Sequence, residues 1–170
     1  MGRNNPVLQD FAIHYCTEHP NVEYIYAEYD PQTKHLTYYS TKRGIIETPE
    51  TREEYMTMLR RAKICLLSSP GIDNTRPMAE GIDYPTPRFY ETAINYCHML
   101  GRYSEDHEEF HLQGIDSVCH NIKSYDQFKD LCDEIMIGNK ALNKKTYDEF
   151  ISKHLTSNWI KELQKQLLQI

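Results

Sequence analysis

Several features that would assign a protein to a familiar class are missing from these 170 residues. No apolar run approaches 18 residues and no signal peptide opens the chain, so the sequence predicts neither membrane spanning nor secretion. Lysine and arginine form no block, and the formal charge of −6 argues against the steering of a nucleic acid. A small phosphorylated ligand stays compatible with that charge, because one arginine and a helix N-terminus are enough to bind it.

Paired cysteines are also missing. The five cysteines form no CxxC motif and their number is odd, and four of them fall in segments that we predict as helix or strand cores. This pattern predicts reduced, buried thiols in a cytosolic protein rather than a disulfide framework or a zinc site.

The motifs of the common enzyme classes do not occur. GxSxG, the P-loop and GxGxxG are absent, which leaves the hydrolase, NTPase and dinucleotide-binding interpretations without support. His107, His111 and His120 fall on a predicted short helix and a separate strand, without an HExxH pattern. We therefore expect no metal site.

What the sequence does contain is typical of a globular chain. Hydrophobic residues make up 39% and charged residues 26%, and a length of 170 residues fits one domain spanning 1–170. Tyrosine is the main aromatic residue, with 13 copies against 5 Phe and 1 Trp. Its polar hydroxyl suits half-buried positions on strands and helices.

Apolar spacing divides the chain into alternating helices and strands. Strands are predicted at 22–29, 36–40, 64–67 and 115–119. Helices are predicted from Pro6 with Asn4 or Asn5 as cap, from Thr48 to about 62, from Thr86 to about Leu100, near 105–110 with Ser104 as cap, from a Ser124 cap, and once or twice between 140 and 170.

This alternation predicts βαβ units and a mostly parallel sheet, hence an α/β fold. The chain opens in a turn, as though a strand ahead of the first helix had been left out. The alternative is a fold that starts with a helix.

The informative stretch runs from Ser68 to Gly101. A buried strand ends in Ser68-Ser69-Pro70, a polar loop follows, and Thr86-Pro87 opens a helix. Ligands of open α/β sheets bind at the carboxyl ends of the strands, where a helix start offers free N–H groups to a phosphate.

Two charged residues stand near the start of that helix, Arg88 in its first turn and Glu91 after it. Arg88 is unfavourable to the helix dipole there, and a bound anion would account for it. Glu91 lies one turn on, where it can accept hydrogen bonds from ribose hydroxyls. The alternative interpretation is that Arg88 and Glu91 form a surface ion pair, and that Asp83 is an ordinary turn residue.

These residues resemble a known signature. Asp83 and Glu91, separated by seven residues after a strand and a Ser-Ser-Pro loop, are similar to the E-x7-E motif of retaining GT-B glycosyltransferases. The segment Pro85–Ala93 resembles the nucleotide-binding helix of the group 1 families, and Gly2-Arg3 resembles the turn that begins their donor domain.

The resemblance implies a fold and a function. The fold would be a Rossmann-like three-layer sandwich, the C-terminal half of a GT-B enzyme. The function would be transfer of a sugar from a UDP- or GDP-sugar donor, with retention of configuration, and without a metal or other cofactor. The partners would be a glycan or lipid-linked acceptor and a missing N-terminal acceptor domain, and no nucleic acid. The enzyme would be cytoplasmic, or peripheral at the inner membrane face through that domain, and would serve polysaccharide biosynthesis.

The resemblance also assigns roles to residues. Glu91 would bind the ribose, Asp83 would be the sugar-side acid, and Thr86, Arg88 and Arg3 would contact the diphosphate. Ser69 would also bind the nucleotide sugar. Asp83 and Arg88 would then be the catalytic groups. Glu80 is an alternative to Asp83 as the sugar-side acid.

A second function stays open. The chain could be a non-catalytic Rossmann-like module that binds a nucleotide or a protein. The aspartate at 83, where the family usually has glutamate, and the lack of lysine between Asn4 and Thr17 favour this alternative.

Overall fold

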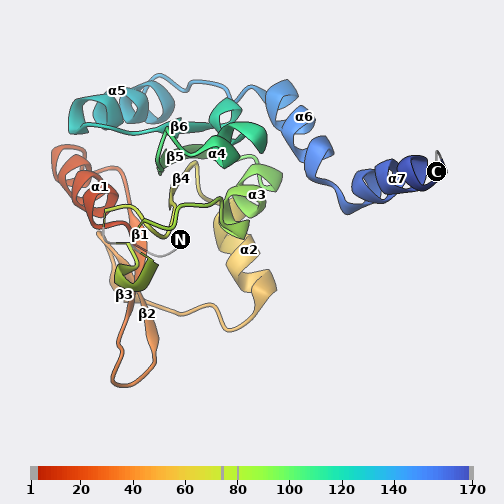
Figure 1. Cartoon of the computed structure of the whole chain (residues 1–170). Coiled ribbons are helices and arrows are strands. Elements are labelled where there is room, and N and C mark those ends of the chain that lie inside the picture. Colours follow the sequence, from red (N-terminus) through yellow and green to blue (C-terminus); the bar gives the residue numbers. More distant parts are fainter. Residues whose placement is uncertain (1–3, 74, 80, 169–170) are drawn as a thin grey trace.

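A computed structural model describes residues 4–73, 75–79 and 81–168 (Figure 1). The strands are β1 (Ile25–Tyr29), β2 (Leu36–Ser40), β3 (Gly44–Ile46), β4 (Ile64–Ser68), β5 (His98–Arg102) and β6 (Cys119–Asn121). The α-helices are α1 (Pro6–Glu18), α2 (Arg52–Arg60), α3 (Pro87–Ile94), α4 (Glu108–Leu112), α5 (Tyr125–Met136), α6 (Lys144–His154) and α7 (Thr156–Leu167). Two 3₁₀ turns lie at Pro77–Ala79 and Ile115–Ser117.

The strands form two separate three-stranded sheets. In the order β4-β5-β6 the strands are parallel, with Ile64 opposite His98 and Met99 opposite Cys119. In the order β1-β2-β3 they are antiparallel. The protein is therefore α/β with a parallel sheet, as predicted. The prediction did not include the antiparallel sheet, which forms because β2 pairs back on β1 and β3 pairs back on β2.

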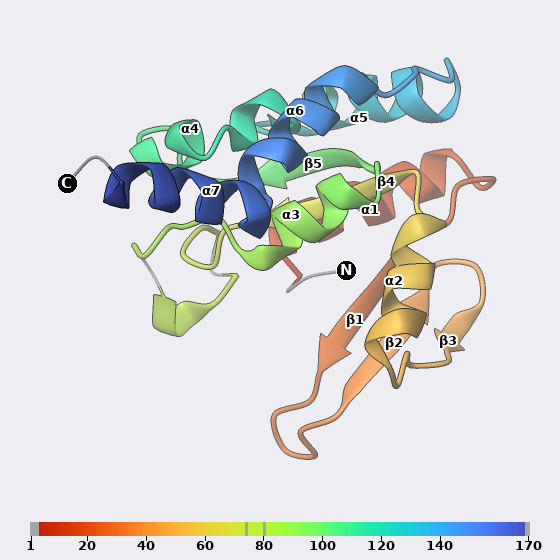
Figure 2. The ribbon, with the colours of Figure 1, turned by 90° about the vertical axis from the view of Figure 1, so that its right-hand side faces the viewer.

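Helices pack on both faces of the parallel sheet (Figure 2). On one face, Leu66 and Leu100 contact the apolar sides of α1 and α5. On the other face, Leu67 and Met99 pack with α3, α4 and α6, and Cys65 packs with α2. Successive side chains of β4 point to opposite faces of the sheet. Because helices cover both faces, the strand is apolar throughout.

Two predicted caps are confirmed. The Oδ1 atom of Asn5 accepts a hydrogen bond from the Leu8 N–H at 3.0 Å, and Pro6 takes the first helical position of α1. The Ser124 hydroxyl accepts from the Gln127 N–H at 3.2 Å at the start of α5. Each side chain satisfies a donor that the helix itself leaves free.

The helix predicted from Thr86 to Leu100 is too long. Its last helical residue is Ile94, and the Asn95 side chain donates to the Glu91 carbonyl at 2.7 Å. Tyr96 then adopts φ 53°, which reverses the chain into β5. The apolar residues after it belong to the central strand of the parallel sheet rather than to a continued helix.

Two other predicted elements also begin at a different residue. Helix α2 begins at Arg52 rather than near Thr48, because Thr51 and Glu54 form a capping box. The strand predicted at 115–119 is a 3₁₀ turn after Gly114, and β6 begins only at Cys119.

The short acidic helix is displaced as well. It was expected near 105–110 behind a Ser104 cap, but α4 starts at Glu108 with His107 in the capping position.

The cysteines match the prediction. All five are free, and Cys65, Cys97, Cys119 and Cys132 are buried. Burial raises the pKa of the Cys132 thiol to about 12, which disfavours the reactive thiolate.

Helix α7 extends away from both sheets (Figure 1). It exposes a row of apolar side chains at helical spacing: Trp159, Ile160, Leu163 and Leu167. Across the described ranges, none of the helices combines the length and apolarity needed to span a bilayer.

Candidate functional site

The carboxyl ends of β4 and β5 are joined by a charged pair. Arg102, the last residue of β5, forms a bidentate ion pair with Asp73 in the loop after β4, and its Nη2 to Oδ1 distance is 2.8 Å. Asn5 donates from Nδ2 to the Asp73 Oδ2 at 2.9 Å, so the start of α1 reaches the same place. The hydrogen bond from Arg102 holds the pKa of the Asp73 carboxyl below its usual range.

The next pair of strand ends is joined by amide contacts. Asn121, at the end of β6, donates from Nδ2 to the Tyr103 carbonyl at 2.9 Å and accepts from the Tyr103 N–H at 3.2 Å. Arg102 also donates to the Ile122 carbonyl at 2.8 Å. The edge of the sheet where ligands of α/β proteins bind is thus rigid and polar.

The loop after β4 folds back on itself, so that the backbone at Gly71 lies against the backbone at Ile82. A Cβ atom on Gly71 would lie 2.4 Å from the Ile82 carbonyl oxygen, so only glycine fits there. This contact brings Asp83 back toward the strand end at Ser69. The Asp83 Oδ2 accepts from the Ser104 N–H at 2.7 Å, just beyond β5.

Two polar atoms in this loop are buried without a hydrogen-bond partner among the described residues. They are the Ser69 hydroxyl, in a side chain that is 0% exposed, and the second carboxylate oxygen of Asp83. Buried polar atoms are nearly always paired, by protein, water or ligand. Ser69 would have to become exposed before a ligand from solvent could touch it.

The start of α3 carries three of the predicted site residues, Thr86, Arg88 and Glu91. Thr86 stands in the N-cap position, but its side chain makes no capping hydrogen bond. Glu91, 14% exposed, accepts from Arg88 at 2.8 Å and from Arg52 of α2 at 2.9 Å. The glutamate is thus held between two arginines, of which Arg52 is largely exposed.

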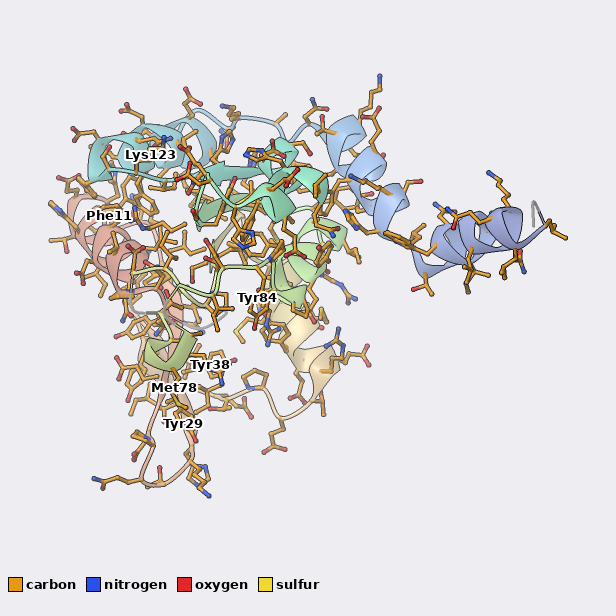
Figure 3. The ribbon with its side chains drawn as sticks, viewed as in Figure 1. Phe11, Tyr29, Tyr38, Met78, Tyr84 and Lys123 are labelled. Carbon is orange, nitrogen blue, oxygen red and sulfur yellow. The ribbon has the colours of Figure 1, made fainter. Side chains whose placement is uncertain are left out.

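Aromatic rings complete this cluster. The Arg88 guanidinium lies 4.3 Å from the ring centroid of Tyr55, a cation–π contact. Burial raises the pKa of the Tyr55 phenol to about 12, and the charge of Arg88 opposes that shift. Burial also raises the pKa of the Tyr38 phenol on β2, and the charge of Arg88 again opposes that shift; Tyr38 is labelled in Figure 3. Met78 and Tyr84, labelled in the same view, are exposed on the loop that leads to α3.

The structure therefore divides the predicted residues. Arg88 and Glu91 form an ion pair. Asp83 has a different partner, the N–H of Ser104, which follows the end of β5. Arg3 and Glu80 lie outside the described residues.

The sequence interpretation missed Arg52 and Tyr55 as neighbours of Glu91. They belong to α2, 39 and 36 positions earlier, so local spacing carried no signal for them. The capping box of α2 could have placed Arg52 correctly in the first turn of that helix.

A cavity of about 960 Å³ lies elsewhere, between α1, α2, α5 and the strands β1 and β4. Among the described residues that line it, Asp83, Thr86, Arg88 and Glu91 do not appear. The candidate site at α3 therefore lies outside this cavity.

Comparisons with family models, with curated proteins and with solved structures find no match. Within the described ranges, no group of three or more His, Cys, Asp or Glu side chains is placed to hold a metal ion. His111, one of the three histidines considered above, pairs instead with Asp116 at 2.9 Å.

Proposed function

We propose that this chain is the donor-binding part of a glycosyltransferase that moves a sugar from a UDP- or GDP-sugar to an acceptor, with retention of configuration. The observation that carries the proposal is the position of Glu91. It stands in the first turns of a Pro-started helix beyond a buried parallel strand, held between Arg88 and Arg52. A carboxylate beside two guanidinium groups can accept from ribose hydroxyls while the arginines face a diphosphate.

The proposal gives each residue a task. Glu91 accepts hydrogen bonds from the ribose, and Arg88 and Arg52 stabilise the charge that develops on the departing diphosphate. Thr86, at the start of α3, donates to the same oxygens from its hydroxyl or its own backbone N–H. Asp83, with one carboxylate oxygen unpartnered among the described residues, is the group on the sugar side.

The proposed architecture is the donor half of a GT-B fold, Rossmann-like and three-layered. Helices on both faces of a parallel sheet support it. The proposal includes no metal and no cofactor besides the donor. Arg3 and Ser69 complete the diphosphate contacts, Ser69 only after an opening of the loop that now buries it.

The proposed partner is an acceptor domain that presents a glycan or a lipid-linked acceptor. The apolar row on α7 supports a contact with further polypeptide, because an isolated helix rarely exposes such a row to water. Under this proposal the enzyme works in the cytoplasm, or at the inner membrane face through its acceptor domain. The isolated chain then binds the donor but transfers little or no sugar.

Calorimetric titration with UDP, GDP and their common sugar conjugates tests the proposal. We expect saturable binding to one base, lost in Glu91→Ala and kept in Glu134→Gln, a matched control that breaks an exposed pair with Lys140. Glu134→Gln should stay folded, because exposed ion pairs contribute about 0–1 kcal/mol. The folding of Glu91→Ala, whose carboxylate is largely buried, is checked by circular dichroism before the titration. Binding that survives Glu91→Ala, or no binding by the folded chain, would reject the proposal.

One observation favours the alternative of a non-catalytic module. Each carboxylate oxygen of Glu91 already accepts a hydrogen bond from an arginine, as in a purely structural ion pair. In that case Glu91→Ala would lower stability slightly and change no nucleotide binding, while substitutions of the exposed α7 residues would remove binding to a protein partner.

A further inference from the structure

Two buried cysteines lie together beneath α2. Cys65 of β4 is 3% exposed, and Cys97, the residue directly before β5, is 1% exposed. Both belong to one apolar cluster with Tyr55 and Leu59 of α2. The two thiols therefore share one packing environment, although they are far apart along the chain.

The strand register places both thiols on the same face of the parallel sheet. Cys65 lies opposite Met99, and Cys97 precedes Met99 by two residues. Side chains two positions apart on a strand point to the same face. The His98 N–H donates to the Lys63 carbonyl, so the pairing of β4 with β5 extends to the position of Cys97. Cys65 and Cys97 are thus diagonal neighbours on adjacent strands.

The sulfur atoms of the pair are within hydrogen-bond reach of each other. The Cys97 S–H has two acceptors there, the Leu59 carbonyl at 3.2 Å and the Cys65 sulfur. The hydrogen bond between the thiols lowers the pKa of Cys65 and raises the pKa of Cys97. Because the thiolate is the nucleophilic form of cysteine, the pair contains one nucleophile and one protonated partner.

The nucleophile of this pair borders a cavity. Cys65 and its neighbour Leu66 line the cavity of about 960 Å³, whereas Cys97 does not appear among the described residues that line it. The exposed residues Glu53 and Arg61 belong to the same lining, so the cavity opens to solvent. A small neutral oxidant that enters the cavity therefore meets Cys65 before Cys97.

The other three thiols lack this combination of features. Burial raises the pKa of Cys16 and of Cys132, which disfavours their thiolates. Cys119 is buried in a different cluster, on β6, and burial raises its pKa as well. Of the five cysteines, Cys65 is the one whose environment favours ionisation.

We propose that Cys65 and Cys97 form a site of reversible oxidation, at which a hydroperoxide converts the two thiols into a disulfide. The Cys65 thiolate attacks one oxygen of hydrogen peroxide, the O–O bond breaks, and a sulfenic acid forms on Cys65 with release of water. The Cys97 sulfur then attacks the sulfenic sulfur, the S–O bond breaks and the S–S bond forms. The proton of Cys97 leaves with that oxygen as a second water, and the peroxide takes up the two electrons that the thiols lose.

The bond requires a movement of Cys97. Diagonal positions on adjacent strands lie farther apart than opposite ones, and a disulfide needs Cα atoms within about 7 Å of each other. Cys97 lies ahead of β5, and its N–H is held only by a long hydrogen bond of 3.4 Å to the Thr92 carbonyl. Its carbonyl accepts from the Tyr147 hydroxyl at 2.8 Å, and the movement draws these two groups apart. The inference is independent of the proposed glycosyltransferase function, since it involves no nucleotide.

The test is disulfide mapping of the natural chain after treatment with hydrogen peroxide. Free thiols are alkylated, the chain is cut with trypsin without reduction, and the peptides are identified by mass spectrometry. Cleavage after Arg88 separates Cys65 from Cys97, so a disulfide joins two distinct peptides. We expect this linked pair as the main intramolecular product, and we expect dithiothreitol to remove it.

Three variants separate the two roles. Cys97→Ala should leave a sulfenic acid on Cys65 that dimedone traps, and Cys65→Ala should leave Cys97 a free thiol. The matched control is Cys132→Ala, which removes another buried thiol that lines the cavity and should form the disulfide like the natural chain. A main disulfide between any other two cysteines, or none in the folded chain, would overturn the proposal.

A second measurement needs no substitution at the pair and covers the case in which a variant does not fold. In the natural chain, the alkylation rates of Cys65 and Cys132 are compared peptide by peptide. We expect Cys65 to react at least about tenfold faster, because its thiolate is favoured and that of Cys132 is not. Equal rates for the two thiols would overturn the proposal.

Discussion

Arg102 and Asp73 form a bidentate ion pair that ties the end of β5 to the loop after β4. Both side chains are largely buried, at 18% and 15% exposed. The pair sits at the edge of the parallel sheet, and Asn5 adds a hydrogen bond to it from the start of α1. The position of the loop that leads to α3 therefore depends on a charge that acid removes.

Asp73→Asn should lower the free energy of unfolding at pH 7 by about 1.5–3 kcal/mol, the range for a hydrogen bond to a charged group. The folded-state pKa of Asp73 is lowered, so its contribution is present above the unfolded value near 4 and is lost as the pH falls through the folded value. The difference in free energy of unfolding between the variant and the natural chain should therefore decrease below about pH 4. Urea denaturation at several pH values between 2 and 7 measures it.

Asp10→Asn serves as the control, since Asp10 is exposed on α1. It should leave stability within about 0.5 kcal/mol at every pH. If the difference in free energy of unfolding caused by Asp73→Asn stays constant down to pH 2, the ion pair contributes no pH-dependent stability.

Asn5→Ala should destabilise the chain by about 2–3 kcal/mol. The change removes the cap of α1 and the hydrogen bonds to Asp73 and Thr75, in a side chain that is 4% exposed. Asn143→Ala removes the comparable cap of α6 at an exposed position and should cost about 1 kcal/mol or less. An equal fall in the denaturation midpoint for the two variants would mean that the hydrogen bonds from Asn5 to Asp73 and Thr75 add nothing to its role as a cap.

Gly71→Ala should displace the loop and disturb the hydrogen bond between Asp83 and the Ser104 N–H, because the new Cβ would overlap the Ile82 carbonyl. Amide exchange at Ser104 should speed up together with a fall in stability. Gly44→Ala is the matched control. It has a positive φ of 70° but open space around its Cβ, so it should cost about 1 kcal/mol and leave Ser104 unchanged. Unchanged exchange at Ser104 in Gly71→Ala would show that the loop tolerates the added atom.

Local chemistry was enough to predict part of this fold. Ser124 was predicted as a cap, and Asn5 as one of two candidates with Asn4, because a cap acts within three residues of itself. The apolar run of β4 was identified because burial on both faces leaves a pattern in the sequence. Strand β5 was missed, since the apolar residues of α3 continue smoothly into it, and only Asn95 and the positive φ of Tyr96 separate the two.

The candidate site shows the same limit. Arg88 and Glu91 lie one turn apart, so their meeting followed from helical spacing. The contact of Arg52 with Glu91 depends on how α2 packs beside α3. The burial of Ser69 depends on the close approach of the backbone at Gly71. Contacts of this kind arise from tertiary packing, which a single sequence does not encode in any short pattern.

The most direct test of the central claim is a map of backbone amide NMR shifts on addition of UDP and of GDP. The account predicts that one nucleotide produces saturable shifts, the largest at Arg88, Phe89 and Tyr90 in the first turn of α3. It predicts that these shifts disappear in Glu91→Ala and persist in Glu134→Gln. The absence of shifts with either nucleotide, or shifts confined to the cavity around Leu66, would contradict a nucleotide site at α3.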